Sequence, residues 1–256
     1  MYNKPKSQQE IRAIRKSGSI LVSILRKIEE FLEPGTTGND VDRLARAELK
    51  RLGGKPAFLG VKGGPGVPDF PATICISVNN AVVHGIPTDE PFKAGDLVGF
   101  DFGVLYGGMI TDAARTFVVG GEANNLQEKK LVEATKRSID AGINAVKPGA
   151  RTGDIGAAVQ SVLDAAGLGI VRDLVGHGVG HELHEAPEIP NYGTRGTGDM
   201  LKEGMTIAIE PMATLGDWRI YIDKDLWTIR TADGTLSAHF EDTILVTRDG
   251  AEILTR

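Results

Sequence analysis

Residues 97–118 read LVGFDFGVLYGGMITDAARTFV, and this stretch carries the most informative pattern in the chain. Two apolar-rich runs flank Gly107-Gly108, a pair with the backbone freedom that a two-residue hairpin turn needs. Counting outward from that turn pairs Gly103 with Asp112, and Asp101 with the residue two positions after Asp112. The stretch therefore predicts an antiparallel hairpin that carries two aspartates.

Side-chain alternation puts Asp101, Gly103 and Asp112 on one face of this hairpin. Residues 98, 100, 102 and 104 are Val, Phe, Phe and Val, and they share the opposite face, which must pack against helices. Asp101 and Asp112 are then diagonal neighbours, roughly 7 to 8 Å apart at the backbone. Carboxylates this close repel one another unless they are protonated or bridged by a cation, so the hairpin predicts a metal site. The alternative is a pair of solvated aspartates on an open sheet face.

Two further acids lie inside apolar strands. Glu210 alternates with isoleucines in the run TIAIEP at 206–211, and Glu241 lies in HFEDTILV at 239–246. An isolated buried carboxylate is costly, so it shifts its pKa, finds a cation or binds metal. Either acid alone is also consistent with a surface position on an edge strand. Asp242 has the opposite parity to Glu241, and the pattern assigns it no role.

All five histidines lie in or beside these segments, at positions 84, 177, 181, 184 and 239. Residues 176–185 read GHGVGHELHE, in which the glycines let the backbone approach a ligand and the histidines supply imidazoles. The spacing of three between His181 and His184 disfavours the zincin helix motif, and no dinucleotide fingerprint or nucleophile elbow occurs. Serine and nicotinamide chemistry are therefore unsupported. We expect His181 and His239 to have surface or supporting roles.

Helical periodicity predicts three amphipathic segments. The first helix is expected over Ser7–Leu32, and a second one, capped by Asn39 or Asp40, is expected to run to Leu52. A third is expected over Gln127–Val146. The strand-forming stretches that follow are 72–78, 97–104, 109–119, 205–211, 227–231 and 237–247, with Asp233-Gly234 as a second two-residue hairpin turn. Runs of helices and runs of antiparallel strands predict the α+β class.

The chain also repeats itself weakly. Pro148-Gly149 corresponds to Pro34-Gly35 at an offset of 114 residues, and the same offset lays Asp154 on Asp40. Such doubling predicts two similar αβ halves that share one sheet and one cleft. We therefore expect a single catalytic domain over 1–256, with halves at about 8–120 and 121–250.

The composition excludes several functional classes. The 256 residues are 41% hydrophobic and include 29 Lys and Arg against 34 Asp and Glu, which gives a formal charge of −5. No basic run suggests recognition of nucleic acid, no apolar stretch approaches the roughly 18 residues of a membrane span, and Met1–Ser7 is too polar for a signal peptide. The single cysteine, Cys75, has no intrachain partner. These features predict a cytoplasmic protein whose metal is functional rather than structural.

Several segments, taken in order, resemble type I methionine aminopeptidases over nearly the whole chain. They are CISVNNAVVHGIP at 75–87, the hairpin from Asp101 to Asp112, GHG at 176–178, His184-Glu185, IEPM at 209–212 and EDT at 241–243. The resemblance implies the pita-bread fold, in which two pseudo-symmetric αβ halves surround a shared antiparallel sheet.

The resemblance further implies a dinuclear centre that holds two divalent metal ions. The implied ligands are Asp101, Asp112, His177, Glu210 and Glu241, with Asp112 and Glu241 bridging. Four carboxylates and one imidazole suit Mn, Fe(II) or Co(II), with Zn (zinc) as an alternative.

The implied reaction is hydrolysis of the first peptide bond, which removes the initiator methionine from nascent proteins and peptides with a small second residue. In the family pattern Glu210 shuttles the proton, His84 contacts the substrate near its amide nitrogen, and His184 contacts the carbonyl oxygen.

The methionine pocket is the part of the resemblance where this chain departs from the family. The matching positions are Phe58, Phe70, Leu183 and Trp227. Val61 stands where an aromatic residue is usual, Leu183 stands where Phe is common, and the loop 62–69 is longer than usual. Pocket shape and substrate range are therefore left open.

Two other readings compete with this one. An aminopeptidase P or prolidase relative uses the same kind of site on the same fold, but such enzymes usually carry a large N-terminal domain, and about 80 residues precede His84 here. A non-catalytic peptide-binding relative typically loses ligand residues, and none is missing. We expect a monomer that acts on N-terminal Met peptides, with the ribosome as a further candidate partner.

Overall fold

The hairpin at 97–118 forms with the predicted register. In this computed structural model β4 (Leu97–Tyr106) pairs antiparallel with β5 (Met109–Val118), and Asp112 lies opposite Gly103. Both residues of the Gly107-Gly108 turn have positive φ, 59° and 82°, as the turn requires. Each strand is ten residues long, so the hairpin spans one half of the molecule.

The structure describes residues 4–256, and the first three residues of the Met1–Ser7 segment lie outside that description. Besides β4 and β5, the elements in chain order are α1 (Gln8–Phe31), α2 (Gly38–Leu52), β1 (Lys55–Pro56), β2 (Cys75–Val78), β3 (Ala81–Val83), α3 (Leu126–Asn144), α4 (Thr152–Ala165), β6 (Gly169–Ile170), β7 (Gly176–Gly178), β8 (Glu185–Ile189), β9 (Thr206–Ile209), β10 (Met212–Thr214), β11 (Ile220–Ile222), β12 (Ile229–Thr231), β13 (Ser237–His239), β14 (Asp242–Thr247) and β15 (Gly250–Ile253). No helix within the described residues has the length and apolar character needed to pass through a bilayer.

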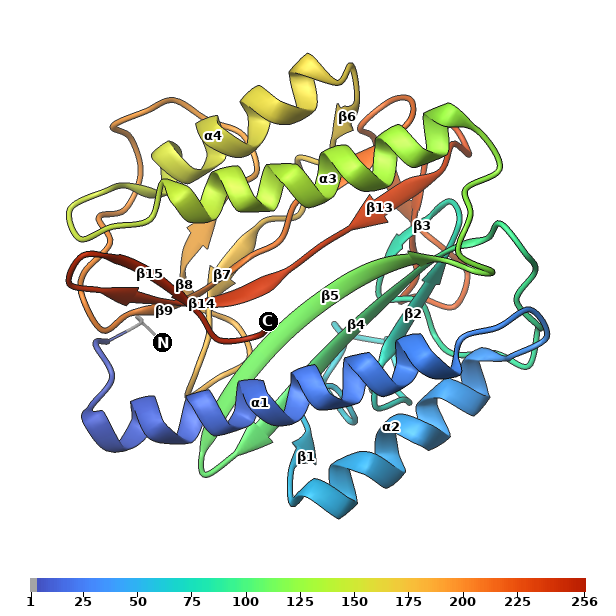
Figure 1. The fold of residues 1–256 in the computed structure, drawn as a ribbon, viewed down its shortest axis with the longest axis horizontal. Helices are drawn as coiled ribbons and strands as arrows, with labels where there is room; N and C mark the ends of the chain where they lie inside the picture. The colour runs from blue at the N-terminus through green and yellow to red at the C-terminus, as the bar shows by residue number, and fades with distance from the viewer. Residues whose placement is uncertain (1–3) are drawn as a thin grey trace.

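Two helix pairs flank the strands (Figure 1). α1 packs along β4 and β5 with α2 beside it, while α3 and α4 pack together over the strands of the second half. The apolar face predicted for β4 is confirmed, because Val98, Phe100, Phe102 and Val104 are fully buried in a cluster with residues of α1 and α2. A second cluster joins α3 and α4 to β9 and β14. Each helix pair thus has its own core.

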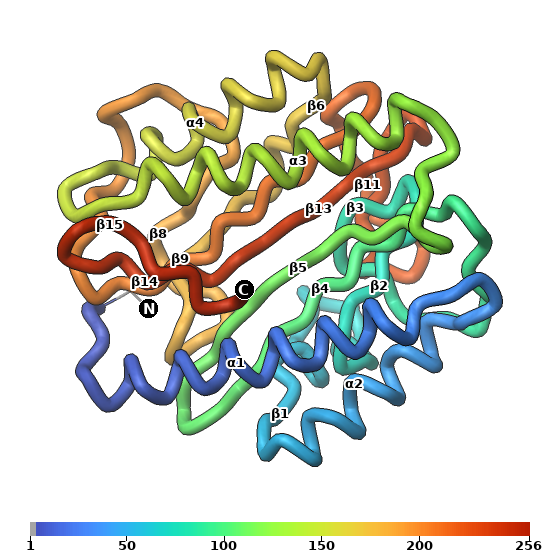
Figure 2. Tube along the Cα trace, in the orientation of Figure 1, coloured from blue at the N-terminus to red at the C-terminus, as the bar shows by residue number. Residues whose placement is uncertain are grey.

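The two halves meet along β5 and residues 239–243, which run side by side through the middle of the molecule (Figure 2). The Glu241 amide donates to the Ala114 carbonyl at 3.0 Å, and the Ala114 amide donates back to Glu241 at 3.3 Å. The Thr243 hydroxyl accepts from the Asp112 amide and donates to the Asp112 carbonyl, both at 2.8 Å. This seam brings two acids that are distant in sequence into adjacent positions.

The weak sequence repeat reappears as a repeated helix start. Thr37 caps α2, and its amide donates to the Asp40 carboxylate at 3.0 Å while the Asp40 amide donates to the Thr37 hydroxyl at 3.1 Å. Asp154 takes the same third-residue position in α4, accepting from the Arg151 amide at 2.7 Å. The prediction that Asn39 or Asp40 caps α2 is therefore wrong. Thr37 is the N-cap residue, and Asp40, three residues later, accepts a hydrogen bond from the Thr37 amide.

The second predicted hairpin is also wrong. Asp233-Gly234 does turn the chain, with Gly234 at a φ of 76°, but the strands on either side do not pair with each other. β12 pairs with β11 and β3, whereas β13 pairs with β10. The strand expected at 237–247 is interrupted between β13 and β14, at Phe240 and Glu241. Each of these strands pairs with other partners, so the turn at Asp233-Gly234 does not close a hairpin.

Gly18→Ala tests the close approach of α1 to the C-terminal strands. A Cβ at this position would lie 2.0 Å from the Leu254 carbonyl oxygen, so the substitution forces α1 away. We expect a loss of about 1–3 kcal/mol in the free energy of unfolding, opposite in sign to the gain of about 0.5–1 kcal/mol for an unhindered helical Gly→Ala change. Urea denaturation measures it, with Ser19→Ala on the exposed side of α1 as the control; equal stability of Gly18→Ala and wild type would contradict the packing.

Candidate metal centre

One cavity of about 500 Å³ contains most of the predicted site residues. Its polar end is lined by Asp101, His177, Glu210 and Glu241, with His84 and His184 beside them. Its apolar end is lined by Phe58, Val61, Phe70, Cys75, Leu183 and Trp227. Charged donors and an apolar chamber thus share one enclosed space.

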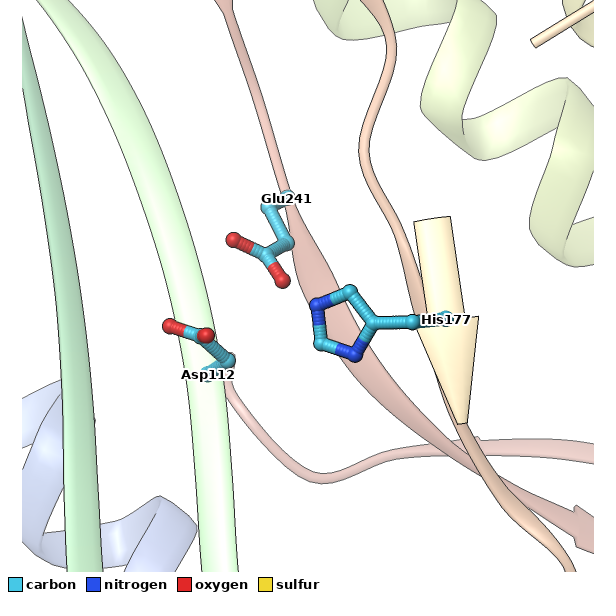
Figure 3. A group of neighbouring side chains, drawn as sticks. All are labelled: Asp112, His177 and Glu241. Carbon is cyan, nitrogen blue, oxygen red and sulfur yellow. The ribbon is translucent and has the colours of Figure 1, made fainter. Parts of the chain in front are cut away.

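Asp112, His177 and Glu241 form the tightest group at the polar end (Figure 3). Each offers one ligand-type atom, and these three atoms all lie within 4.8 Å of one another. In Figure 3 the three side chains converge from three separate strand segments toward a common point. Asp112 comes from β5, Glu241 from the interruption between β13 and β14, and His177 from β7. The seam between the halves is therefore what assembles this group.

The ring of His177 is fixed by its own backbone. Its Nδ1 lies 2.9 Å from the Gly178 carbonyl oxygen, so Nδ1 carries the proton and Nε2 is left with a lone pair. Nε2 lies 3.5 Å from Oε1 of Glu210, the residue that directly follows β9. A neutral imidazole held in this tautomer is the form that ligates metals.

Asp101 and Glu210 complete the predicted group of five. Asp101 lies on β4 and lines the cavity, and it forms no ion pair with a cationic side chain among the described residues. Glu210 lies between two imidazoles, with His177 on one side and His239 Nε2 at 3.7 Å from its other oxygen. Four of the five predicted ligand residues therefore line the cavity, and Asp112 joins them through its group with His177 and Glu241.

The electrostatics of this group favour a cation. Burial raises the pKa of Asp101, Glu210 and Glu241, and it raises the pKa of Asp112 to about 7. Burial also lowers the pKa of His177 to about 3, so the one imidazole among them supplies no positive charge. Buried oxygens of Asp101, Asp112 and Glu241 have no hydrogen-bond partner among the described residues. Four acids with a neutral imidazole and unsatisfied oxygens fit a divalent cation.

His84 and His184 lie on the cavity wall next to this group. The His184 ring meets the His177 ring edge-on, with centroids 4.5 Å apart. His84 has a φ of 58°, a left-handed conformation that costs free energy for a residue with a Cβ. Burial, with a smaller effect from His184, lowers the pKa of His84 to about 4, and burial also lowers the pKa of His184. Both rings are therefore neutral near pH 7.

The comparisons with known proteins agree with this geometry. Residues 12–248 match metallopeptidase family M24. The chain belongs to this family. A methionine aminopeptidase of Clostridium perfringens is 43% identical over 250 residues, covering 98% of this chain and 97% of the relative. The crystal structure of a methionine aminopeptidase from Thermotoga maritima superposes with a TM-score of 0.94 at 45% identity, over 99% of both chains.

A less similar structure shares this fold over part of its own length. A prolidase from Pyrococcus furiosus has a TM-score of 0.76 at 28% identity, and the match covers 98% of this chain but 65% of the prolidase. The fold of this chain is the pita-bread fold of the M24 enzymes, as the sequence predicts. Use of divalent metal follows from membership of this metallopeptidase family together with the clustered ligand-type atoms.

The apolar end of the cavity is built by the expected pocket positions, Val61 among them, and by Cys75, which the sequence pattern does not assign to the pocket. Phe70 meets Trp227 edge-on, with centroids 5.2 Å apart, and the Trp227 indole donates to the Pro68 carbonyl at 2.9 Å. Val61 and Cys75 complete this wall. Burial raises the pKa of the Cys75 thiol. The indole bond fastens the long 62–69 loop to the pocket.

Three residues near the M24 centre have roles that the pattern left undefined. His239 is 3% exposed and lies beside Glu210, so the surface position that was one of the two roles expected for it is wrong. The His181 side chain is 41% exposed and its Nε2 lies 2.7 Å from Glu10, away from the acids. Asp242 is fully buried, and it accepts from Arg115 at 2.6 Å and from Arg256 at 2.8 Å. The sequence did not predict these ion pairs, because Asp242 alternates in phase with the apolar residues of its strand.

Gly103→Ala and Gly99→Ala form a matched test of the pocket. A Cβ at position 103 would lie 2.7 Å from the Phe58 ring and 2.8 Å from Ala57, whereas a Cβ at position 99 would meet nothing closer than 3.6 Å. We expect Gly103→Ala to raise KM for a Met-peptide by about tenfold, since it displaces a pocket wall worth about 1.4 kcal/mol, and Gly99→Ala to leave KM within about twofold. Equal KM values for the two variants would contradict the pocket assignment.

Asp112→Asn tests the ligand cluster through stability. Adding Mn²⁺ to chelator-treated wild type should raise the melting temperature, because an ion at 100 times its dissociation constant stabilises the folded state by about 2.7 kcal/mol. We expect Asp112→Asn to keep its far-UV circular dichroism and to lose most of that shift. Asp173→Asn, a surface acid, is the control and should respond as wild type does. An undiminished shift in Asp112→Asn would remove this residue from the cluster.

Proposed function

We propose that this M24 enzyme is an aminopeptidase that hydrolyses the first peptide bond of proteins and peptides and releases N-terminal methionine when the second residue is small. The observation that carries the proposal is that the acidic centre and the apolar chamber share one cavity. The relatives named methionine aminopeptidase match this chain over nearly its whole length, which supports the same reading.

The proposed metal centre holds two divalent ions, with Co, Mn, Fe(II) and Zn (zinc) as the ions that its donors suit. Asp101, Asp112, His177, Glu210 and Glu241 would hold these ions. The clustering of Asp112, His177 and Glu241 within 4.8 Å supports this arrangement. When bound, such ions lower the pKa of water and polarise the scissile carbonyl.

Three side chains of the protein carry out proton transfer and substrate binding in this proposal. Glu210 is the proton carrier in this proposal: it lines the cavity beside His177, and burial, with the charge of Asp112, raises the pKa of its carboxyl group above the usual value. His84 contacts the substrate near the amide nitrogen of the scissile bond. His184 donates to the carbonyl oxygen and stabilises the charge that develops there. A neutral imidazole can do either, because it has one N–H donor and one acceptor nitrogen, and burial lowers the pKa of both rings.

Selectivity for methionine rests on the apolar end of the cavity. An unbranched thioether fits a chamber of aromatic and aliphatic walls and gains contacts with aromatic edges. Phe58, Phe70, Leu183 and Trp227 provide those walls here, and Val61 leaves more room than an aromatic residue would. The proposed substrate is therefore an N-terminal Met chain, with tolerance for slightly larger first side chains.

The proposed activity also places the protein in the cell. Initiator methionine is present on chains as they are synthesised, so we propose a cytoplasmic enzyme that acts as a monomer on nascent chains, with the ribosome as a candidate partner. A formal charge of −5 argues against a separate role in recognising nucleic acid.

Peptide hydrolysis by metal-loaded enzyme tests the proposal. We expect release of Met from Met-Ala-Ser, and at least about 100-fold lower kcat/KM for a Met-Lys peptide, a difference of about 2.7 kcal/mol in transition-state binding. An X-Pro peptide with a first residue other than Met is the control for the prolidase-like alternative. Preferential cleavage before proline would transfer the chain to that activity, and no cleavage of any peptide by metal-loaded protein would favour a binding role.

A further inference from the structure

The segment Gly180–Glu185 places Leu183, His184 and Glu185 on the cavity wall, and it is also bound to the start of the chain. Four side chains make the connection, and we call them the N-terminal clamp: Lys6, Glu10, His181 and Glu185. Lys6 Nζ lies 3.2 Å from Glu185 Oε2, and His181 Nε2 lies 2.7 Å from Glu10 Oε1. Residues at the two ends of the clamp are far apart in sequence, so the clamp is a tertiary feature.

The ion pair in this clamp is buried almost completely. The Lys6 side chain is 0% exposed and the Glu185 side chain 2% exposed. A buried ion pair loses nearly as much hydration energy as its attraction returns, so it adds little net stability compared with apolar residues. It does fix geometry, because removing Lys6 takes a cation away from a carboxylate that is almost completely buried. Its position beside the cavity therefore points to placement of the segment rather than to stability.

Glu185 uses its second oxygen to hold the turn of the segment. Oε1 of Glu185 accepts from the His181 amide at 2.7 Å and from the Glu182 amide at 3.1 Å. One carboxylate thus binds Lys6 with one oxygen and two backbone amides with the other. These amides belong to the two residues before Leu183. Because Lys6 holds the other oxygen of the same carboxylate, it orients the group that shapes the turn.

Gly180 provides the space for Lys6. A Cβ on Gly180 would lie 2.6 Å from Cε of Lys6, and Gly180 has a φ of 151°. The Lys6 stem therefore occupies the volume that any other residue would fill at this position. The Lys6 amide donates to the Gly204 carbonyl at 2.8 Å, and this bond holds the backbone at Lys6 in place.

Glu10 links the clamp to α1. Its Oε2 accepts from the Ser7 amide at 2.7 Å and completes the capping box of α1, while its other oxygen meets His181. Ser7, three residues before Glu10, is the helix cap. The start of α1 and the segment that carries His184 are therefore held by shared side chains.

We propose that Lys6 is a positioning residue for His184, acting through Glu185 and the turn at 181–183. This inference rests on the proposed function, since it gives His184 its place against the substrate carbonyl. Misplacing a catalytic side chain by about 1 Å can cost about 100-fold in rate, so the effect is expected in kcat. Substrate affinity should change less than kcat, because Leu183 is the one pocket wall within the clamped segment, whereas Phe58, Phe70 and Trp227 lie outside it.

The central experiment compares Lys6→Met, Glu185→Gln and the double variant in the metal-loaded enzyme. Lys6→Met keeps the stem and removes the charge, while Glu185→Gln keeps the Oε1 acceptor for the two amides. We expect Lys6→Met to lower kcat for Met-Ala-Ser about 10- to 100-fold with KM within about threefold. Adding Glu185→Gln should recover at least about threefold of kcat, because the unpaired carboxylate is then gone. Mn²⁺ affinity should stay within about twofold.

Arg15→Gln is the matched control. Arg15 also extends from α1 and pairs with Glu252 at 2.7 Å, but this exposed pair leads to β15 and not to the cavity. It should leave kcat within about twofold of wild type, as expected for a surface ion pair.

Amide hydrogen exchange in residues 180–185 tests the clamp without activity. We expect faster exchange there in Lys6→Met and unchanged exchange in Arg15→Gln, with or without metal. If wild type cleaves no Met-peptide, the proposed function fails, while exchange still judges the clamp. Unchanged kcat in Lys6→Met, or unchanged exchange in both Lys6→Met and Glu185→Gln, would overturn the positioning role. Should Lys6→Met not fold, Glu185→Gln alone decides by the same two measurements.

Discussion

Burial of four carboxylates around one neutral imidazole is the constraint on which the rest of the structure depends. Asp101, Asp112, Glu210 and Glu241 lie in one cluster, and several of their oxygens find no donor among the described residues. A fold accepts such a cost only where a cation or a reaction repays it. Every surrounding element, including two separate hydrophobic cores, serves to hold these acids close together.

The seam between the two halves is what makes this cluster from distant parts of the chain. Backbone pairing of Ala114 with Glu241 and the hydroxyl bonds of Thr243 to Asp112 fix the two halves in register. A shift of one residue along the seam would turn Glu241 away from Asp112, because side chains alternate faces. The interruption between β13 and β14 falls at this point, so the strand gives up regular pairing where the site needs a side chain.

Local sequence patterns predict the hairpin of β4 and β5, but they do not predict which distant segments pair with each other. The turn at Gly107-Gly108 has one favourable geometry, so the register of β4 and β5 and the face of Asp112 follow from counting. The turn at Asp233-Gly234 looks alike in sequence, yet its flanking strands choose partners elsewhere. Lys6 shows no local signal at all, because its partner is 179 residues away and becomes visible only in three dimensions.

Metal location is the most direct test of the central claim, because it depends on geometry and not on substrate choice. Anomalous diffraction from crystals of the Mn²⁺-loaded protein would locate the ions. We expect anomalous density enclosed by Asp112, His177 and Glu241, with Asp101 and Glu210 at its edges. Bound manganese located elsewhere, with those five side chains hydrogen-bonded only to water, would contradict it.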